Sequence, residues 1–434
     1  MADSTLATSY RTFRRDLHQQ PEPAWCEFYT TSRLLEELEQ REIDDLLSGP
    51  AIHAPDSRRN VPDDTTLTEW RQRAREAGAS EDALATSGDG FTGAVAVVER
   101  GDGPTIALRV DIDALPITEA DSDDHYPTAA GFRSTNEGYM HACGHDAHAT
   151  IGLGVLDRIL DSDFAGTFKL LFQPAEETIS GGKSIADSGV LDDVDALLAP
   201  HIGLDHPSGE VVAGIDDFLA VRQFEATFTG ESAHAGARPE DGDNAVQAMA
   251  AAVQNLYGIP RNSAGGTRVN AGRVGGGTAS NIVPEESFIE GEVRGETTGL
   301  MESMWDHAED VLAGAARMHN CEVDIERLGD APSAHSDAAV VEVVDRVARQ
   351  TTGVDTVVEY DSLGGSEDAT YLMQRVHQRG GLAAYVGVGT DHPGGHHTPT
   401  FDVQERDIAV GIDLLAGVIT DLAGDFPVGG AAAT

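Results

Sequence analysis

TFKLLFQPAEE (residues 167–177) is an apolar run that passes directly into a proline and two adjacent glutamates. Short apolar runs bounded by breaker residues are typical of buried strands. Similar runs are GAVAVVE (93–99), TIALRVDID (105–113), DALLAPHIG (195–203) and LAAYVGVGT (382–390), and a helical pattern begins near residue 145. Repeated alternation of strand and helix predicts an α/β fold with a mostly parallel sheet and helices on both faces.

A different pattern occupies the middle of the chain. RQFEATFTG (222–230) and SFIEGEVRGE (287–296) alternate apolar and polar residues, and NAVQAMAAAVQNLYGI (244–259) has helical spacing. Alternation is typical of strands with one face in water. We therefore predict a smaller α+β domain at 218–331, inserted into a larger domain made of 1–217 and 332–434. Residues 4–47 predict two helices, and the polar stretch 48–87 predicts an insertion with a helix at 65–78.

Composition limits the classes of function. The chain has 434 residues, with 74 acidic and 29 basic side chains and a net charge of −45. This charge repels nucleic acids and anionic membranes. Acidic residues spread over the whole chain indicate a solvated surface suited to a salt-rich, halophilic cytoplasm. Three cysteines, no apolar segment near the roughly 18 residues of a membrane span and no signal-peptide core predict a cytoplasmic protein.

HACGHDAH (141–148) concentrates side chains that bind metals. Cys143 and His145 are two residues apart, so both can turn toward one point before a helix begins. Thiolate and imidazole are ligands that suit zinc and similar ions. Alone, this segment leaves open a buried cysteine flanked by surface histidines.

Four strand ends carry such side chains. In a largely parallel sheet, ligands gather beyond the carboxyl ends of the strands. Besides the segment 141–148, three strand ends carry such residues: Glu176 and Glu177 on one, His201 on another, and His396 and His397 on the third. Adjacent carboxylates point in different directions, so one can bind a metal while its neighbour acts as a general base. A solvated acidic pair is the alternative for the two glutamates.

The chain resembles the amidohydrolase and metallocarboxypeptidase family with two metal ions. The resemblance covers nearly the whole sequence and rests on MHACGHDAH, FQPAEE, PHIG, GESAHAGARPEDGDNA, SNIVP and GHHTPTFD, which occur in the family's order. The family includes aminoacylases, hippurate hydrolases and plant hydrolases of indole-acetyl amino acids. Within it, the chain most resembles the A subunits of p-aminobenzoyl-glutamate hydrolases.

The resemblance implies a site with two divalent ions, manganese or zinc, in the larger, catalytic domain. Glu176 is the implied general base, and Asp113 is an acid near the metals that positions a ligand. Cys143 occupies the place of a bridging aspartate in many relatives, so a thiolate bridge is expected. The implied ligands are Cys143, His145, Glu177, His201 and His397. His141, His148, His392 and His396 match no ligand position.

The inserted domain resembles the family's dimerisation lid. This implies that His234 enters the active site of a neighbouring subunit, in a homodimer or in a heterodimer with a related subunit. Asn281 and Arg294 match positions that hold the substrate's carboxylate. The alternative for Arg294 is a cross-strand pair with Glu290 or Glu292, and for Asn281 a turn ahead of Pro284.

The expected activity is metal-dependent hydrolysis of the amide bond of N-acyl or N-aroyl amino acids, of the p-aminobenzoyl-glutamate type. A broad N-acyl-amino-acid amidohydrolase or aminoacylase is the alternative within the same class. A non-catalytic partner subunit is the alternative outside it, and the presence of every implied ligand together with Glu176 argues against that alternative.

Overall fold

The computed structural model describes residues 6–392 and 394–426, which form two compact units. Unit 1 combines Met1–Asp216, Ala334–Leu363 and Asp368–Thr434, and unit 2 combines Asp217–Ser333 with Gly364–Glu367. Among the described residues, no helix is both long and apolar enough to cross a membrane.

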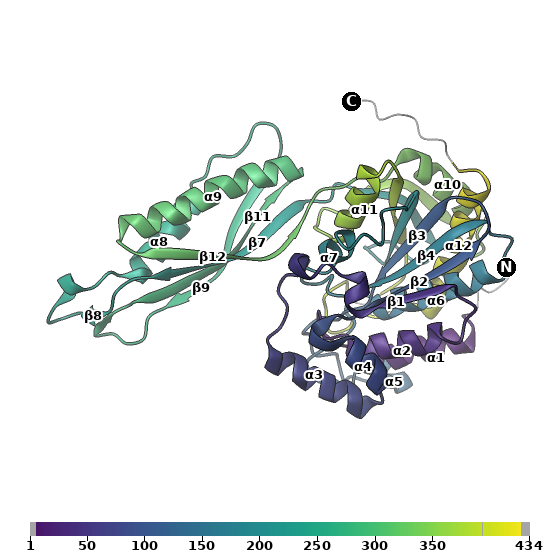
Figure 1. The fold of residues 1–434 in the computed structure, drawn as a ribbon, viewed down its shortest axis with the longest axis horizontal. Helices are drawn as coiled ribbons and strands as arrows, with labels where there is room; N and C mark the ends of the chain where they lie inside the picture. Colours follow the sequence, from purple (N-terminus) through teal and green to yellow (C-terminus); the bar gives the residue numbers. More distant parts are fainter. Residues whose placement is uncertain (1–5, 393, 427–434) are drawn as a thin grey trace. The chain divides into compact units, whose positions relative to one another are not determined.

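Unit 1 is built on an eight-stranded sheet with the order β1-β2-β4-β3-β5-β14-β6-β13 (Figure 1). β3 runs parallel to β4 and β5, β14 runs parallel to β5, and β13 runs parallel to β6, whereas the pairs β1–β2, β2–β4 and β6–β14 are antiparallel. The fold is therefore the predicted α/β class with a largely parallel sheet. The strands are β1 (Asp45–Ser48), β2 (Ala94–Arg100), β3 (Thr105–Asp111), β4 (Gly166–Gln173), β5 (Ala196–Ile202), β6 (Glu210–Asp216), β13 (Thr356–Ser362) and β14 (Leu382–Val388).

Helix α6 lies at the centre of unit 1 and packs on β3, β4 and β5, with α1 and α12 beside it. A Cβ added at Gly154 would lie 2.3 Å from Ile412 of α12, so glycine permits this close contact. Helices α7 and α11 pack together, and α11 also contacts β5 and β14. The helices are α1 (Thr8–Gln19), α2 (Phe28–Leu38), α3 (Asp64–Ala77), α4 (Glu81–Thr86), α5 (Tyr126–Ala130), α6 (His145–Leu160), α7 (Gly182–Ala186), α10 (Ala338–Ala348), α11 (Ala369–Gln378) and α12 (Glu405–Gly424).

The polar stretch 48–87 has a small core of its own. Leu67, Trp70 and Leu84 are buried with Cys26 and Phe28 of the N-terminal region. Asp63 caps α3 by accepting a hydrogen bond from the Thr66 N–H, which satisfies one unpaired donor of the first turn. Because β1 pairs with β2, the chain just before this stretch already belongs to the main sheet.

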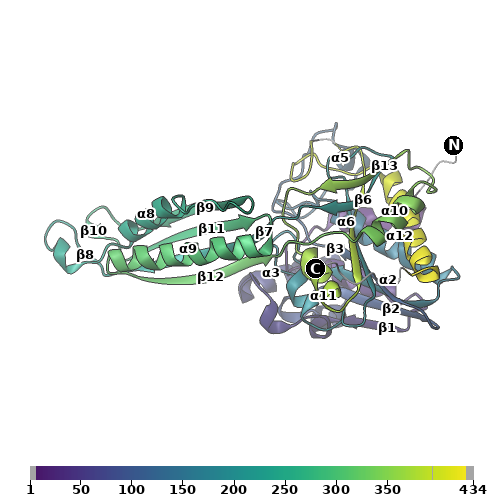
Figure 2. The same cartoon turned by 90° about the horizontal axis from the view of Figure 1, so that it is seen from above.

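Unit 2 is a four-stranded antiparallel sheet with the order β12-β7-β11-β9, on which α8 and α9 pack (Figure 2). The alternation seen in the sequence buries Phe224, Ala226 and Phe228 with Trp305 of α9. A two-stranded ribbon, β8 with β10, lies in the same unit. The elements are β7 (Ala220–Thr229), β8 (Ala233–His234), α8 (Ala245–Leu256), β9 (Thr267–Gly276), β10 (Ile282–Val283), β11 (Glu286–Gly295), α9 (Thr298–Met318) and β12 (Glu322–Ala331).

A buried charge network connects α1 to the start of α6. Arg14 lies 2.7 Å from Asp146 and 2.5 Å from Asp402, and His18 lies 2.8 Å from Asp146 and 3.0 Å from Glu119. Burial and the Arg14 charge lower the pKa of His18, but the two carboxylates outweigh them and raise it to about 9. His18 is therefore protonated near neutral pH, and both ring nitrogens donate.

Candidate metal centre

The turn before α6 places Cys143 and His145 side by side. Gly144 has a φ of +86°, a left-handed conformation that favours glycine. A Cβ at Gly144 would also lie 2.7 Å from the Ile202 side chain of β5. The sequence Cys-Gly-His thus bends tightly against the neighbouring strand, and both flanking side chains are buried.

The five predicted ligands come together around this turn. Donor atoms of Cys143, His145 and Glu177 lie within 4.8 Å of one another. The Cys143 Sγ is 3.4 Å from His201 Nε2, and the Glu177 Oε2 is 3.5 Å from His397 Nε2. Cys143 therefore belongs to two overlapping donor groups, one with His201 and one with His145 and Glu177.

Asp113 fixes the orientation of His145. The His145 Nδ1 lies 3.0 Å from the Asp113 carbonyl oxygen and 3.2 Å from its Oδ1, so Nδ1 carries a proton and donates. Asp113 Oδ2 accepts a 2.9 Å hydrogen bond from the Glu177 N–H. One carboxylate thus positions two ligand residues, an arrangement common around metal-binding histidines.

The opposite nitrogen of His145 has the properties of a ligand atom. Its Nε2 is buried without a hydrogen-bond partner among the described residues, and lies 3.8 Å from Glu177 Oε1. Burial lowers the pKa of His145, but Asp111, then Asp113 and Glu177, raise it to about 10. The surroundings of this nitrogen therefore favour a positive charge, whether a proton or a bound cation.

His201 is held as a neutral ring. Its Nδ1 donates to the Ile202 carbonyl at 2.9 Å, which leaves the Nε2 lone pair directed at Cys143. Burial, followed by the nearby His148 and His396, keeps the pKa of His201 well below its ordinary value. A neutral imidazole is the form that binds a metal.

His148 is buried and supports this site through hydrogen bonds. Its Nε2 accepts a 2.8 Å hydrogen bond from the Ile202 N–H, so the proton lies on Nδ1, which donates to Asp111 at 2.5 Å. The bond to Ile202 fixes the backbone next to His201. The only sequence signal for this role was that His148 follows His145 by three residues in HDAH, at the start of α6.

Glu176 lies beside the donor cluster. Its Oε2 is 3.9 Å from His145 Nε2, and the residue is 8% exposed. The preceding Ala175 has a φ of +57°, and its N–H donates to the buried Glu27 at 2.8 Å. This turn directs consecutive glutamates in different directions, and Glu27 is a supporting residue that the sequence pattern did not indicate.

His396 is closer to the site than the sequence implied. Donor atoms of His396, Cys143 and His201 lie within 4.8 Å of one another, although the resemblance gives His396 no ligand position. His396 Nε2 lies 3.1 Å from the Ile202 carbonyl oxygen. Its neighbour His397 has a φ of +58° and donates its N–H to the Ala142 carbonyl. The two adjacent histidines thus face different parts of the cluster.

His234 and Asn281 lie together in unit 2. His234 pairs with Ile282 in the β8–β10 ribbon, and the Asn281 carbonyl accepts the Ala235 N–H. The N–H groups of Gly236 and Ala237 both donate to His234 Nδ1 at 3.1 Å. The ring proton must therefore lie on Nε2, where it is available for donation to an external acceptor.

Arg294 lies far from these two residues within the same unit. On β11 it pairs with Val221 of β7, whereas the ribbon follows the other end of β7 at Thr229. Eight residues of strand separate these ends, or about 27 Å. Arg294 donates to both carboxylate oxygens of Glu292, at 2.8 and 3.0 Å, and to Ser366. In the structure Arg294 therefore pairs with Glu292 of its own strand and not with a residue of a neighbouring strand.

Comparison with known proteins places the chain in a family. Residues 107–421 match the model of the peptidase family M20/M25/M40. The chain belongs to this family. It is 43% identical over 409 residues to the indole-3-acetyl-aspartic acid hydrolase of Enterobacter agglomerans, and the match covers 93% of each chain.

Two further relatives of this M20-family chain are informative. The A subunit of p-aminobenzoyl-glutamate hydrolase from Escherichia coli strain K12 is 40% identical over 417 residues and 95% of each chain. The aminobenzoyl-glutamate utilization protein of Klebsiella pneumoniae, a crystal structure, has a TM-score of 0.83 at 35% identity, covering 97% of each chain. Similarity therefore extends over both units.

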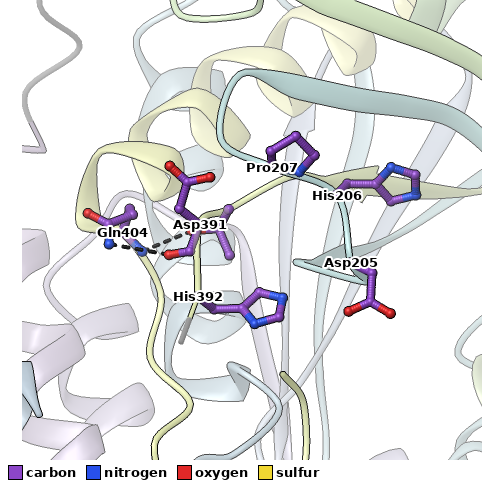
Figure 3. A pocket seen from close by; sticks show the side chains of 7 residues that line it. Asp205, His206, Pro207, Asp391, His392 and Gln404 are labelled. Atoms are coloured by element: carbon purple, nitrogen blue, oxygen red, sulfur yellow. Dashed lines mark hydrogen bonds between the residues drawn. The ribbon is translucent and has the colours of Figure 1, made fainter. Parts of the chain in front are cut away.

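A separate pocket of this M20-family chain lies near His396, and Figure 3 shows the side chains that line it. Its volume is about 460 Å³, and none of the five predicted ligands lines it. It approaches the site through His392, whose ring is 5.0 Å from the ring of His396. The lining residues are Asp205, His206, Pro207, Thr390, Asp391, His392 and Gln404.

Proposed function

We propose that this protein is a metal-dependent amidohydrolase that cleaves the amide bond of N-acyl or N-aroyl amino acids, with p-aminobenzoyl-glutamate as the preferred type of substrate. One observation carries the proposal: donor atoms of Cys143, His145 and Glu177 lie within 4.8 Å of one another, and the buried His145 Nε2, which has no hydrogen-bond partner among the described residues, lies 3.9 Å from the Glu176 carboxylate. The relatives that are 40–43% identical are named as hydrolases of two such conjugates.

The donor set fits two divalent ions. Cys143, His145 and Glu177 would hold one ion, and His201 with Cys143 would hold a second, so Cys143 belongs to both donor groups. His397 completes the set through its approach to Glu177. Thiolate, imidazole and carboxylate suit zinc, and the carboxylate and imidazole also suit manganese. A related structure from Bacillus subtilis is described as a dinuclear metal-binding peptidase.

Bound ions would lower the pKa of a coordinated water and polarise the scissile carbonyl. Glu176 accepts the proton of the attacking water and returns it to the leaving amine, because its carboxylate borders the donor cluster. The nitrogen thereby leaves as a neutral amino group. Asp113 keeps His145 in the tautomer that this arrangement requires.

His234 supplies the hydrogen bond to the developing oxyanion, from the lid of a neighbouring protomer. Its Nε2–H is fixed by two backbone donors on Nδ1, so it is organised for donation before substrate binds. Asn281 and Arg294 are assigned to the substrate's carboxylate; because they lie about 27 Å apart within one lid, one carboxylate can meet both only if they come from different protomers. The partner is a second copy or a related chain, since one relative is named as part of an enzyme with more than one kind of subunit.

We place the protein in the cytoplasm, where its three cysteines, which form no disulfide, remain reduced. The acidic surface fits a salt-rich cytoplasm.

The direct test uses the purified full chain, stripped of metal and then supplied with manganese or zinc. We expect release of glutamate from p-aminobenzoyl-glutamate and of aspartate from indole-3-acetyl-aspartate. Acetylated amino acids test the broader alternative, and Glu176→Gln is the matched control. If neither ion restores cleavage of any substrate in the panel, although the chain is folded and binds metal, the proposed activity is wrong.

A further inference from the structure

Three other potential metal ligands of unit 1 lie together and share no residue with the Cys143 cluster. Donor atoms of His335, Asp337 and His377 all lie within 4.8 Å of one another. His335 and Asp337 belong to the segment just before α10, and His377 lies in the last turn of α11. The proposed hydrolysis uses none of them.

The backbone beside two of these residues is firmly held. Ser336, between His335 and Asp337, donates its N–H to Asp216 at 2.6 Å and its hydroxyl to the Ile215 carbonyl at 2.8 Å. The Ser336 hydroxyl also accepts the Tyr385 N–H at 3.0 Å. Three bonds to two strands fix this segment, so His335 and Asp337 are presented from a rigid base.

Asp337 is fixed in the same way. Its N–H donates to the Ala383 carbonyl, and its Oδ2 accepts the Ala383 N–H, both at 2.7 Å. The same oxygen accepts from His377 Nε2 at 2.7 Å. Asp337 Oδ1 faces His335 Nε2 at 3.8 Å, which is too long for a hydrogen bond. One carboxylate thus lies between two imidazole nitrogens.

The imidazole rings of His335 and His377 are stacked. Their centroids are 4.8 Å apart and their planes differ by 18°. Ligands about 2.0–2.1 Å from one zinc ion are roughly 3.3 Å apart in a tetrahedral site and cannot exceed about 4.2 Å. The 3.8 Å between His335 Nε2 and Asp337 Oδ1 therefore lies within the separation of two ligands of one ion. The His335 side chain is 68% exposed, so it can turn to adjust this distance.

We propose that His335, Asp337 and His377 form a surface site for one divalent ion of the zinc class. Two imidazole nitrogens and one carboxylate oxygen suit Zn²⁺ and its neighbours in the first transition row, whereas Mg²⁺ and Ca²⁺ prefer all-oxygen sites. Water fills the remaining position because the site is open. The bound ion joins the segment before α10 to the end of α11.

The net charge of −45 supports occupancy, because an acidic surface concentrates divalent cations near the protein. Binding requires His377 to give up the proton that it now donates to Asp337. The affinity for zinc should therefore decrease on acidification, as it does where ligands must be deprotonated.

The test compares the zinc content of full-length proteins after equilibration with buffered Zn²⁺ and removal of excess ion by gel filtration. We expect His335→Gln to bind one zinc fewer per chain than the wild type, with unchanged hydrolysis. His335 is exposed, so this change leaves folding intact. The matched control is His307→Gln, which changes an exposed histidine of α9 outside any such donor group and should retain the full zinc content.

A titration at low zinc concentration measures the affinity of the proposed site for zinc. Loss of a direct ligand should weaken this site by more than the 10- to 100-fold cost of losing an outer hydrogen-bond partner. His377→Gln should lose the same single ion. The comparison is a difference between proteins, so it does not depend on how many ions the Cys143 cluster holds. Equal zinc content in wild type, His335→Gln and His377→Gln would overturn the proposal.

Discussion

The donor cluster of unit 1 and the β8–β10 ribbon of unit 2 differ in how their side chains are held. His145 and His201 are buried, and each has one ring nitrogen fixed by a hydrogen bond within unit 1. His234 is exposed, and the backbone fixes only its Nδ1. The buried candidate ligands thus have hydrogen-bond partners within their own unit, whereas the Nε2 of the exposed His234 has none among the described residues of unit 2.

This difference separates two contributions to activity. Variants in the cluster should remove the metal and with it catalysis, because the candidate ligands form overlapping donor groups. Variants in the ribbon should leave the metal in place and weaken only the chemical step. Measuring metal content alongside turnover therefore distinguishes the two regions.

The largest effect is expected for a metal ligand. His201→Ala removes a donor that faces Cys143 at 3.4 Å, so we expect loss of bound metal. Turnover should fall by more than about 10⁴-fold, beyond the usual range for loss of a general base. Elemental analysis and a substrate assay check both effects, with His234→Ala as the control that keeps its metal. Full metal content in His201→Ala would remove His201 from the ligand set.

Removal of the general base should have the next largest effect. Glu176→Gln keeps the size of the side chain but cannot accept a proton, so kcat should fall 10²- to 10⁴-fold. Metal content and KM should stay near wild type, and steady-state kinetics with metal analysis measures all three. Near-normal kcat in this variant would assign the proton transfer to another group.

A smaller effect is expected in the ribbon. His234→Ala removes the donor of one hydrogen bond to the oxyanion, which typically costs 10²- to 10³-fold in kcat. If His234 acts in a neighbouring protomer, mixing this variant with Glu176→Gln creates dimers with one intact and one doubly defective site. Such mixed dimers should recover about half of wild-type activity. Proven exchange of protomers without recovery would mean that the ribbon serves its own chain.

The smallest effect is expected for the residue that supports the cluster. Asn at position 113 cannot accept hydrogen bonds from both His145 and Glu177, because its amide has only one acceptor oxygen. Asp113→Asn should therefore weaken metal binding about 10- to 100-fold, and excess metal should restore turnover. Exposed Asp163→Asn is the matched control for the loss of one charge. Unchanged affinity would show that Asp113 does not support the ligands.

Part of this architecture was predictable because buried parallel strands are apolar and end in polar loops. The runs that became β2, β3, β4, β5 and β14 were recognised because they are apolar, and the carboxyl edge shared by the parallel strands β3, β4, β5 and β14 brought Cys143, Glu177 and His201 together. β13 was missed because an edge strand with an exposed face lacks a continuous apolar run. β1 was missed because only four residues pair.

The candidate site was also only partly predictable from the sequence. His396 lies with Cys143 and His201 because the turn at residues 394–397 has a left-handed backbone at three positions that no apolar pattern encodes. Arg294 was matched to a substrate contact, yet its bonds to Glu292 depend on side-chain conformation within one strand. Apart from β1, β6 and β13, the strands of the larger sheet could be predicted from the sequence, but the geometry of loops and of salt bridges could not.

The network around Arg14 also constrains the order in which the chain can mature on the ribosome. Arg14 bonds Asp402 across 388 residues while it contacts Asp146, the neighbour of His145. The proposed ligands themselves extend from residue 143 to residue 397. A nascent chain cannot close the Arg14 contacts until residue 402 has been synthesised, nor the proposed ligand set until residue 397 has been. The larger unit must therefore complete its proposed metal centre after residues 217–333 of unit 2, which are synthesised earlier as one continuous segment.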